Sequence, residues 1–448
     1  MAIKRKIAVV GTARAGKTVF LTSLINHLDI HKKTEFAIGE TGDVRITNFE
    51  EVPMDTVEPF KYRAFRSALV YNGRWPEKTC DSSHFICKFG RSDWRWSDSQ
   101  LHFFDLPGER IADAKIAEYT DYAEWSDYLH DYITSEAPYR QMAKAYLDLL
   151  DGGELTLGEA VHQFKIALAE FTLSYKTMIS PSTFLLGKNG STPKSKTRDE
   201  FLNEVTQRHV GLEMNSNGQD GQFAPLPKVV REKHGKLSEH FAQNYECYRK
   251  EVVLPIYGHF RSCHRMIVLV DIPSLLNGGV SMFNDNYEHI KAIFEALKPK
   301  SFIYRLFSSE NKIDRVAFVA TKRDLVHPSD LGDEKKPESD RLIGLLLQMT
   351  ESFKWDFPDI DFQWFTCSAI ESAEQAHGEM KLRGKPVKDN PEREDKTFSV
   401  SKLPEAWAKS WQPGDYHYHS VHPRVPPNKL IAPAQTNLND VFTFISKD

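Results

Sequence analysis

The sequence has few cysteines, and their arrangement indicates neither a disulfide framework nor a zinc site. Five cysteines are scattered over 448 residues, and none forms a CxxC pair. The chain has no run of about 18 or more apolar residues, so we expect no membrane-spanning helix. Its N-terminus lacks the long apolar stretch and cleavage site of a secretory signal. The cytoplasm is the simplest compartment for such a chain.

The sequence also has little net charge. The formal net charge is −4 and the isoelectric point is about 6.5, so no nucleic-acid partner is expected from electrostatics. Charged residues make up 27% of the chain and hydrophobic residues 40%, an ordinary globular composition. The length indicates two or three domains, or one core domain with a large insert.

One glycine-bearing segment fits the phosphate-binding pattern GxxxxGK[ST]. Residues 11–18 read GTARAGKT, between a predicted strand at 6–11 and a predicted helix at 18–29. Glycine lets the backbone curl so that several N–H groups face one anion, and the helix dipole adds positive potential. We expect Lys17 to bridge the β- and γ-phosphates and Thr18 to ligate Mg²⁺. The residues expected to contact the nucleotide here are Gly11, Ala13, Arg14, Ala15, Gly16, Lys17, Thr18 and Val19.

A second motif, Asp105-Leu-Pro-Gly108, follows a predicted strand at 101–104 and matches the DxxG pattern of GTPases. A carboxylate there can hold Mg²⁺ through water, and the Gly108 N–H can meet a γ-phosphate oxygen. The next residue is Glu109, where Ras-type sites place a glutamine that orients the attacking water. A carboxylate accepts a hydrogen bond from water but donates none to phosphate. Glu109 therefore has three interpretations: a catalytic base, an ion-pair partner or a structural cap.

Two further residues bear on hydrolysis. Arg14 lies inside the phosphate loop, where it either acts as an arginine finger on the transferring group or pairs with an acidic residue of the insert. The remaining Mg²⁺ ligand is the threonine of the first switch. We favour Thr79, because it lies just ahead of a predicted strand at 84–90. The other candidates are Thr41, Thr47 and Thr56.

A base-reading motif follows the predicted strand at 315–320. Thr321-Lys322-Arg323-Asp324 resembles [NT]KxD, in which the aspartate accepts hydrogen bonds from guanine N1–H and N2–H₂ and the lysine stem lies over the base. Adenine cannot supply these donors. Asn311-Lys-Ile-Asp314 also fits NKxD, but it precedes the strand, whereas ligands of such sheets bind beyond the carboxyl ends of strands. We therefore assign Asp324.

Two more features lie after predicted strands. Ser368 and Ala369 follow the strand at 361–366 and resemble the SA turn whose backbone N–H meets guanine O6. Asp271 ends the predicted strand at 265–270, and we interpret it as a turn-capping carboxylate.

The order of these patterns predicts an α/β fold. Strands alternate with helical patterns after residue 262, whereas residues 110–262 show helical spacing without strand alternation. We expect a P-loop NTPase with a Ras-like GTPase core, a mostly parallel sheet flanked by helices, and a large, mainly helical insert domain. The predicted boundaries are 1–109 for the first part of the core, 110–262 for the insert and 263–448 for the second part. Residues 371–403 are expected to form a loop or excursion.

Segments along nearly the whole chain match those of one family: GTARAGKT (11–18), Trp75-Pro76 with Thr79, DLPGE (105–109), VLVD (268–271) with Leu276-Asn277, and ATKRD (320–324). On these segments the chain resembles the YcjX-like family of bacterial P-loop proteins, which are related to Ras-type GTPases. The resemblance implies binding of GDP or GTP, a helical insert in a GTPase-like core, and a link to envelope or phage-shock-type stress with membrane-stress machinery at the inner membrane.

Together these features predict a GTP-binding protein that hydrolyses GTP to GDP and phosphate with Mg²⁺, slowly without a partner. Because the insert directly follows the second switch, we expect it to meet a protein partner in a nucleotide-dependent way. The alternative is a nucleotide-gated scaffold with negligible hydrolysis. An ATP-using kinase or ATPase is disfavoured by TKRD at 321–324.

Overall fold

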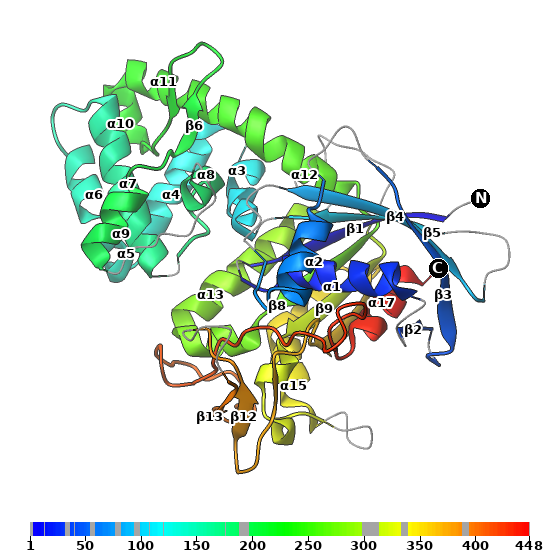
Figure 1. Cartoon of the computed structure of the whole chain (residues 1–448). Helices are drawn as coiled ribbons and strands as arrows, with labels where there is room; N and C mark the ends of the chain where they lie inside the picture. Colours follow the sequence, from blue (N-terminus) through cyan, green and yellow to red (C-terminus); the bar gives the residue numbers. More distant parts are fainter. Residues whose placement is uncertain are drawn as a thin grey trace. The chain divides into compact units, whose positions relative to one another are not determined.

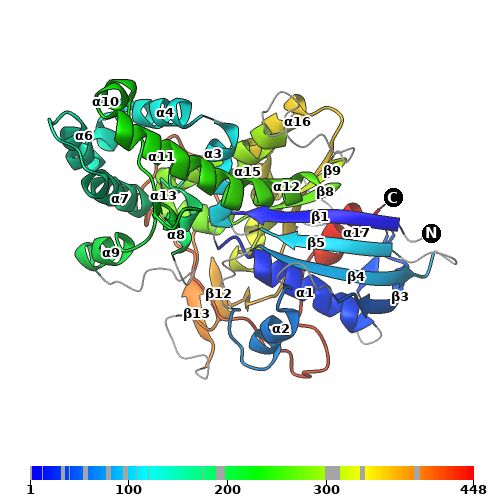
Figure 2. The same ribbon diagram turned by 90° about the horizontal axis from the view of Figure 1, so that it is seen from above.

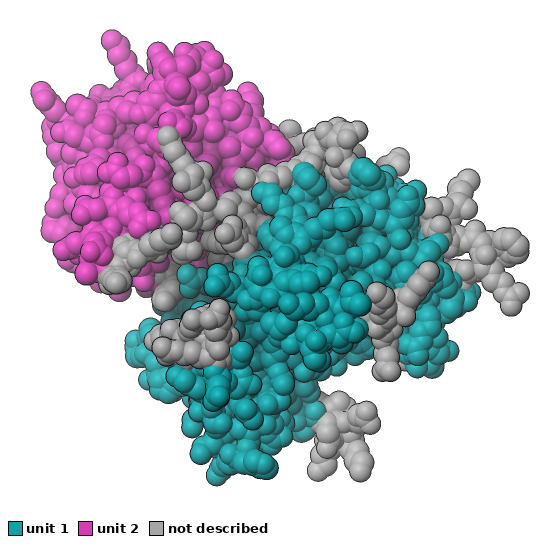
Figure 3. All heavy atoms as spheres, in the orientation of Figure 1, with its two compact units in different colours: residues 1–107, 262–283, 310–448 teal, residues 108–261, 284–309 magenta. Residues whose placement is uncertain are grey.

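The structure is a computed structural model, and it divides the chain into two compact units (Figures 1 and 3). Unit 1 comprises Met1–Pro107, Ser262–Phe283 and Glu310–Asp448, and unit 2 comprises Gly108–Arg261 and Asn284–Ser309. The structure describes residues 3–12, 14–31, 36–39, 41–53, 59–76, 82–93, 99–106, 108–119, 121–174, 176–187, 197–297, 313–332, 339–387 and 394–447.

Unit 1 is built on one large sheet with eight strands among the described residues. They lie in the order β10-β9-β8-β1-β5-β4-β3-β2. The pairs from β10 to β5 are parallel, and the pairs from β5 to β2 are antiparallel. The strands are β1 (Ile3–Gly11), β2 (Ala37–Ile38), β3 (Val44–Glu51), β4 (Ser83–Arg91), β5 (Ser99–Asp105), β8 (Arg265–Val270), β9 (Arg315–Thr321) and β10 (Asp361–Cys367).

The carboxyl ends of the parallel strands meet at one edge of this sheet. Asp105 at the end of β5 lies beside Val9 of β1. Thr321 at the end of β9 lies beside Cys367 at the end of β10. The loops that follow these strands are therefore neighbours, although they are far apart in the sequence.

Helices cover both faces of the sheet, as Figure 2 shows for α1 and α16. On one face, an apolar cluster joins the sheet to α1 (Lys17–Asp29), α2 (Tyr62–Val70) and α17 (Leu438–Ser446). On the other face, α15 (Arg341–Thr350) and α16 (Ser352–Asp356) follow β9, and Phe353 stacks on Phe318. The first helix forms because five apolar residues recur at helical spacing and are buried: Phe20, Leu21, Leu24, Ile25 and Leu28.

The strands predicted at 6–11, 84–90, 101–104, 265–270, 315–320 and 361–366 and the helix predicted at 18–29 are present, and β4 and β5 pair in the antiparallel sense. The prediction of a loop at 371–403 was wrong in part. This segment contains the antiparallel sheet of β11 (Ala373–Gln375), β12 (Lys381–Gly384) and β13 (Lys396–Ser399). Its strands are three or four residues long, which is too short for an alternating pattern to be recognised. Two 3₁₀ turns, η4 (Arg323–Leu325) and η5 (Pro328–Asp330), follow β9.

Unit 2 is mainly helical and has its own apolar core. Trp125, Phe223 and Tyr245 form its aromatic centre, with ring centroids 5.2 to 5.6 Å apart. The elements are η2 (Gly108–Asp113), α3 (Ala114–Glu118), α4 (Tyr122–Ser135), α5 (Ala137–Met142), α6 (Lys144–Leu150), α7 (Leu157–Leu173), α8 (Ser182–Leu186), α9 (Arg198–Val205), β6 (Gly211–Met214), β7 (Asp220–Gln222), α10 (Lys228–Lys233), α11 (Gly235–Tyr248), the π-helical turn η3 (Arg249–Val253) and α12 (Leu254–Arg261).

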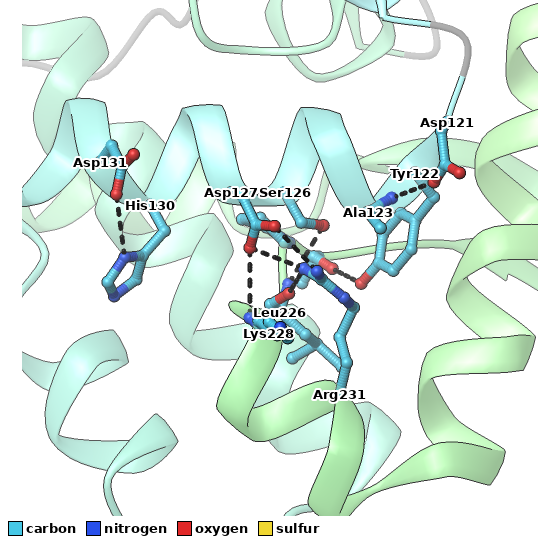
Figure 4. A network of polar contacts seen from close by, with 12 residues as sticks. Asp121, Tyr122, Ala123, Ser126, Asp127, His130, Asp131, Leu226, Lys228 and Arg231 are labelled. Atoms are coloured by element: carbon cyan, nitrogen blue, oxygen red, sulfur yellow. Dashed lines mark hydrogen bonds and ion pairs between the residues drawn. The ribbon is translucent and has the colours of Figure 1, made fainter.

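A polar network fixes α4 against the segment that enters α10 (Figure 4). The Asp127 carboxylate accepts two hydrogen bonds from the Arg231 guanidinium, both at 2.8 Å, and one from the Lys228 N–H at 3.1 Å. The hydrogen bonds from Arg231 lower the pKa of Asp127, so the carboxylate is ionised at neutral pH. The segment ahead of α10 includes Phe223 and Leu226, which are fully buried in the core.

Unit 2 includes Asn284–Ser309 as well as Gly108–Arg261, whereas the predicted insert was 110–262. The long helix α13 (Ile272–Leu297) begins in unit 1 and ends in unit 2, with Gly279 in a non-helical conformation at φ 81°. The sequence analysis, in contrast, assigns all of 263–448 to the core.

No helix among the described residues is long and apolar enough to cross a lipid bilayer.

Candidate functional site

The phosphate-loop motif forms the turn from β1 to α1. Gly11 has φ 151°, and Gly16, which precedes α1, has φ 89° and ψ 17°. A Cβ atom at Gly11 would lie 2.5 Å from the Leu269 carbonyl oxygen, so this position requires glycine. Arg14 has φ 67°, a left-handed conformation that is uncommon for a residue with a Cβ atom. Such conformations cluster at ligand-binding loops.

Lys17 closes this loop from the inside. Its ammonium group donates hydrogen bonds to the carbonyl oxygens of Gly11 at 2.7 Å and Thr12 at 2.9 Å. The Lys17 side chain is buried, whereas Arg14 is exposed. The loop thus holds a positive charge at its centre and a second one at its surface, as an anion-binding loop requires.

Oxygen donors suited to a divalent cation lie at the same edge. Asp105 is fully buried at the end of β5, beside Val9. Thr18 is the second residue of α1. A carboxylate and a hydroxyl are hard ligands of the kind that Mg²⁺ takes in nucleotide sites, so the donor chemistry fits this ion.

The sheet register separates the candidates for the switch threonine. Ser83 at the start of β4 lies beside Asp105, whereas Arg91 at its other end lies beside Ile46 of β3. Thr47 is the next residue of β3, and Thr41 precedes that strand, so both lie toward the end of β4 remote from Asp105. Thr79 and Thr56 lie outside the described residues. The register therefore disfavours Thr41 and Thr47, but it does not separate Thr79, which stays our prediction, from Thr56.

The lysine of the base-reading motif is held by an aspartate of a neighbouring strand end. Lys322 has φ 59°, and its ammonium group donates a hydrogen bond to the Asp271 carboxylate. The same carboxylate accepts hydrogen bonds from Ser274, at 3.1 Å from its N–H and 2.5 Å from its hydroxyl. Asp271 therefore caps the start of α13, which confirms the predicted turn cap, and it also pairs with Lys322.

The aspartate of the same motif is surrounded by donors from the loop after β10. Asp324 Oδ1 accepts a hydrogen bond from the Ser368 hydroxyl at 2.8 Å. Asp324 Oδ2 accepts hydrogen bonds from the Ser372 N–H at 2.7 Å, the Ser372 hydroxyl at 2.5 Å and the Ala373 N–H at 3.2 Å. The structure thus brings TKRD together with Ser368, although the two motifs are more than forty residues apart in the sequence. Thr321 lies at the end of β9, where its hydroxyl donates to the Val270 carbonyl oxygen at 3.4 Å.

The loop after β10 also contacts the first helix. The Ser23 hydroxyl of α1 donates a hydrogen bond to the Ala369 carbonyl oxygen at 2.5 Å. The next residue toward β10, Ser368, forms a reciprocal pair of backbone hydrogen bonds with Thr436 at 2.9 and 3.0 Å. Burial raises the pKa of the neighbouring Cys367 thiol, so it is a packing residue with no nucleophilic thiolate.

The structure does not test the role of every predicted residue. Gly108 and Glu109 begin η2 in unit 2. Their part in the nucleotide site remains a prediction. Ala13 and Asn311 lie outside the described residues.

Sequence reasoning missed Ser23 and Ser372. Neither belongs to a motif, and no pattern in the chain marks them. A serine a few residues after Ser368 and a polar residue on the buried face of α1 are the only signals that could have drawn attention to them.

Comparison with known proteins agrees with this fold. The sequence matches the family described as "YcjX-like family, DUF463" over residues 5–186 and 215–448. It is 25% identical over 353 residues to a Shewanella oneidensis protein named Ras-like GTPase YcjX, a similarity that covers 72% of this chain and 68% of that relative. The predicted fold class, an α/β core with a mainly parallel sheet flanked by helices, is confirmed. The chain belongs to the YcjX-like family.

Proposed function

We propose that the protein binds GTP and GDP and hydrolyses GTP to GDP and phosphate with Mg²⁺. The observation that best supports this proposal is the convergence of the loops after β1, β9 and β10 at one edge of the unit 1 sheet. These loops contain Lys17, Asp324 and Ser368, which represent the phosphate-binding and base-reading motifs.

The phosphate loop would bind the triphosphate through its backbone N–H groups and the Lys17 ammonium. Thr18, Thr79 and Asp105 would hold Mg²⁺, which neutralises phosphate charge when bound. Arg14 would reach the transferring phosphoryl group from its strained loop position, since its side chain is exposed. Glu109 would accept a hydrogen bond from the attacking water, and Gly108 would donate its N–H to the γ-phosphate.

Base selectivity tests the binding part of the proposal. Fluorescent GDP, GTP and ATP are titrated with Mg²⁺ into the wild type, Asp324→Ala and Asp324→Asn. Asp151→Ala, at an exposed turn of unit 2, is the matched control. We expect guanine nucleotides to bind at least tenfold more tightly than ATP, and Asp324→Ala to remove that preference. Equal binding of ATP to the wild type would contradict the guanine assignment.

Single-turnover release of phosphate from GTP tests the catalytic part. We expect Arg14→Ala and Glu109→Ala each to slow the step by tenfold or more, with GTP affinity changed less than threefold. A wild-type rate no faster than that of Lys17→Ala would instead favour the alternative function, a nucleotide-gated scaffold that does not hydrolyse GTP. An ATPase or kinase would require ATP binding that Asp324→Ala leaves unchanged.

We also propose that the bound nucleotide controls how unit 2 meets a protein partner. Support comes from η2, which follows β5 in the chain and is tied to the rest of unit 2. Asp113 of η2 is fully buried and accepts hydrogen bonds from the Ser182 N–H at 2.9 Å, the Ser182 hydroxyl at 2.6 Å and the Tyr248 hydroxyl at 2.9 Å. A change at Gly108 would therefore reach α8 and α11 through Asp113.

Hydrogen exchange tests this switch. We expect amides near Ser182 and Tyr248 to exchange at different rates with GDP and with a non-hydrolysable GTP analogue. Identical exchange in the two states would contradict it. From the family resemblance alone, we also propose that the protein is cytoplasmic and acts at the inner membrane in an envelope or stress response.

A further inference from the structure

We infer that Asp324 offers a bound purine only one oxygen, Oδ1, so that the site accepts 6-oxopurine nucleotides as a class, inosine nucleotides as well as guanosine nucleotides. This inference rests on the proposed function, in which Asp324 reads the base.

The donors around Asp324 are unequally shared between its two oxygens. Oδ2 accepts three hydrogen bonds, two from Ser372 and one from the Ala373 N–H, at 2.5 to 3.2 Å. Oδ1 accepts one, from the Ser368 hydroxyl. A carboxylate has about four acceptor positions, roughly two on each oxygen. Oδ2 is therefore fully used by the protein, and Oδ1 has room for one further donor.

The segment that occupies Oδ2 is anchored on both sides. Before it, Ser368 exchanges two backbone hydrogen bonds with Thr436, and the Glu371 N–H donates to the Ala434 carbonyl oxygen at 2.8 Å. After it, Ala373 begins β11 and pairs with Gly384 of β12. Two of the three donors to Oδ2 are backbone N–H groups of this anchored segment, so they remain in place when a base binds.

Because only Oδ1 of Asp324 can accept a further hydrogen bond, the donors on each purine determine which base binds. Guanine presents two neighbouring donors, N1–H and the 2-amino group, whereas hypoxanthine presents N1–H alone. With Oδ2 fully used, the 2-amino group gains no charged acceptor, and its loss in inosine costs little. Adenine has an unprotonated N1 facing the carboxylate, so it is still rejected.

Competition titrations with GDP, IDP and ADP against a fluorescent guanine nucleotide test the inference on the full-length wild type. We expect the dissociation constants of GDP and IDP to agree within threefold, and that of ADP to be at least tenfold higher. An IDP constant ten or more times that of GDP would overturn the inference while leaving the guanine assignment intact. Equal binding of ADP and GDP would overturn the proposed function itself.

Two variants of Ser372 test whether backbone donors alone occupy Oδ2. Ser372→Ala removes the hydroxyl donor and keeps the N–H groups of residues 372 and 373, so two donors still fill that oxygen. We expect the ratio of IDP to GDP dissociation constants to stay within twofold of the wild-type ratio. Ser372→Thr retains the hydroxyl and should also keep the wild-type ratio. A ratio that rises at least threefold in Ser372→Ala alone would overturn the inference that the two backbone donors keep Oδ2 from the 2-amino group.

Discussion

The Ser23 hydroxyl and the Ala369 carbonyl oxygen lie 2.5 Å apart and form a hydrogen bond. Ser23 lies on α1, whose first residue is Lys17, and Ala369 lies in the loop assigned to the base. One helix therefore contacts the proposed phosphate site at its start and the proposed base loop along its length. This hydrogen bond directly connects the helix that begins at the proposed phosphate site with the loop assigned to the base.

Ser23→Ala should weaken guanine nucleotide binding three- to tenfold, because the Ala369 peptide loses the donor that orients it. The affinity for ADP should fall less, because the proposed contacts of this loop are with guanine and not with adenine. The matched control is Thr22→Val, since the Thr22 hydroxyl donates only to the Thr18 carbonyl oxygen within α1. GDP and ADP titrations measure the effect, and equal losses for the two nucleotides would argue against the link.

Asp271 should have two separable roles. Asp271→Asn keeps an oxygen for the Ser274 N–H but loses the charge that pairs with Lys322. Asp271→Ala loses both. We expect Asp271→Ala to lower the free energy of unfolding by about 1 kcal/mol more than Asp271→Asn, the usual worth of a helix cap.

Both Asp271 variants should weaken GDP binding several-fold, because Lys322 is no longer held. Urea unfolding and GDP titration of the two variants check these expectations. Ser274→Ala, which keeps the ion pair, is the control for binding. GDP affinity unchanged in Asp271→Asn would show that Lys322 needs no partner.

His27 should make the protein less stable in mild acid. It stacks on Phe36 with ring centroids 5.0 Å apart, and burial lowers the pKa of its imidazole to about 4. Because the folded pKa lies below the ordinary value of 6.5, the unfolded chain binds the proton first as the pH falls. The free energy of unfolding should therefore fall between about pH 6.5 and pH 4, by about 2 kcal/mol at pH 5.

Urea unfolding at pH 7, 6 and 5 measures this dependence. His27→Leu fills a similar volume without titrating, so its stability should change less across the same range. His162→Gln, at an exposed position of α7, should retain the full wild-type dependence. A slope unchanged in His27→Leu would assign the acid sensitivity to other groups.

Much of the fold could be predicted from the sequence because its core strands are short apolar runs followed by recognisable loops. The run at 265–270 is entirely buried in β8, and such a run admits few structures other than a central strand. The short strands β2 and β11 gave no such signal, because two or three residues cannot display a period.

The residues of the candidate site also fall into those that the sequence predicts and those that it does not. Gly11, Lys17 and Asp324 belong to motifs whose spacing reflects a local chemical need. Ser23 and Ser372 reach the site only through contacts between elements distant in the sequence. Their roles depend on the register of β9 with β10 and on the packing of α1, neither of which a single sequence reveals.

Two arginines at the opposite edge of the sheet should anchor the last helix. Arg265 and Arg315 begin β8 and β9 side by side, and both donate to carbonyl oxygens at the end of α17. Positive charge is favourable at a helix C-terminus. The Arg265 side chain is 1% exposed and lies 2.5 Å from the Ile445 carbonyl oxygen, and burial lowers its pKa to about 10, so it stays charged at neutral pH.

Arg265→Ala should therefore lower the free energy of unfolding by about 2 to 3 kcal/mol, because it opens a cavity and removes a charged donor from a buried carbonyl. Arg315→Ala should cost about 1 kcal/mol, since its side chain is less buried, its contact with the Phe444 carbonyl oxygen is long at 3.4 Å, and its hydrogen bond to the Lys447 carbonyl oxygen is exposed to solvent. Urea unfolding measures both. Equal losses, or a larger loss for Arg315→Ala, would mean that burial of the guanidinium does not determine how α17 is held.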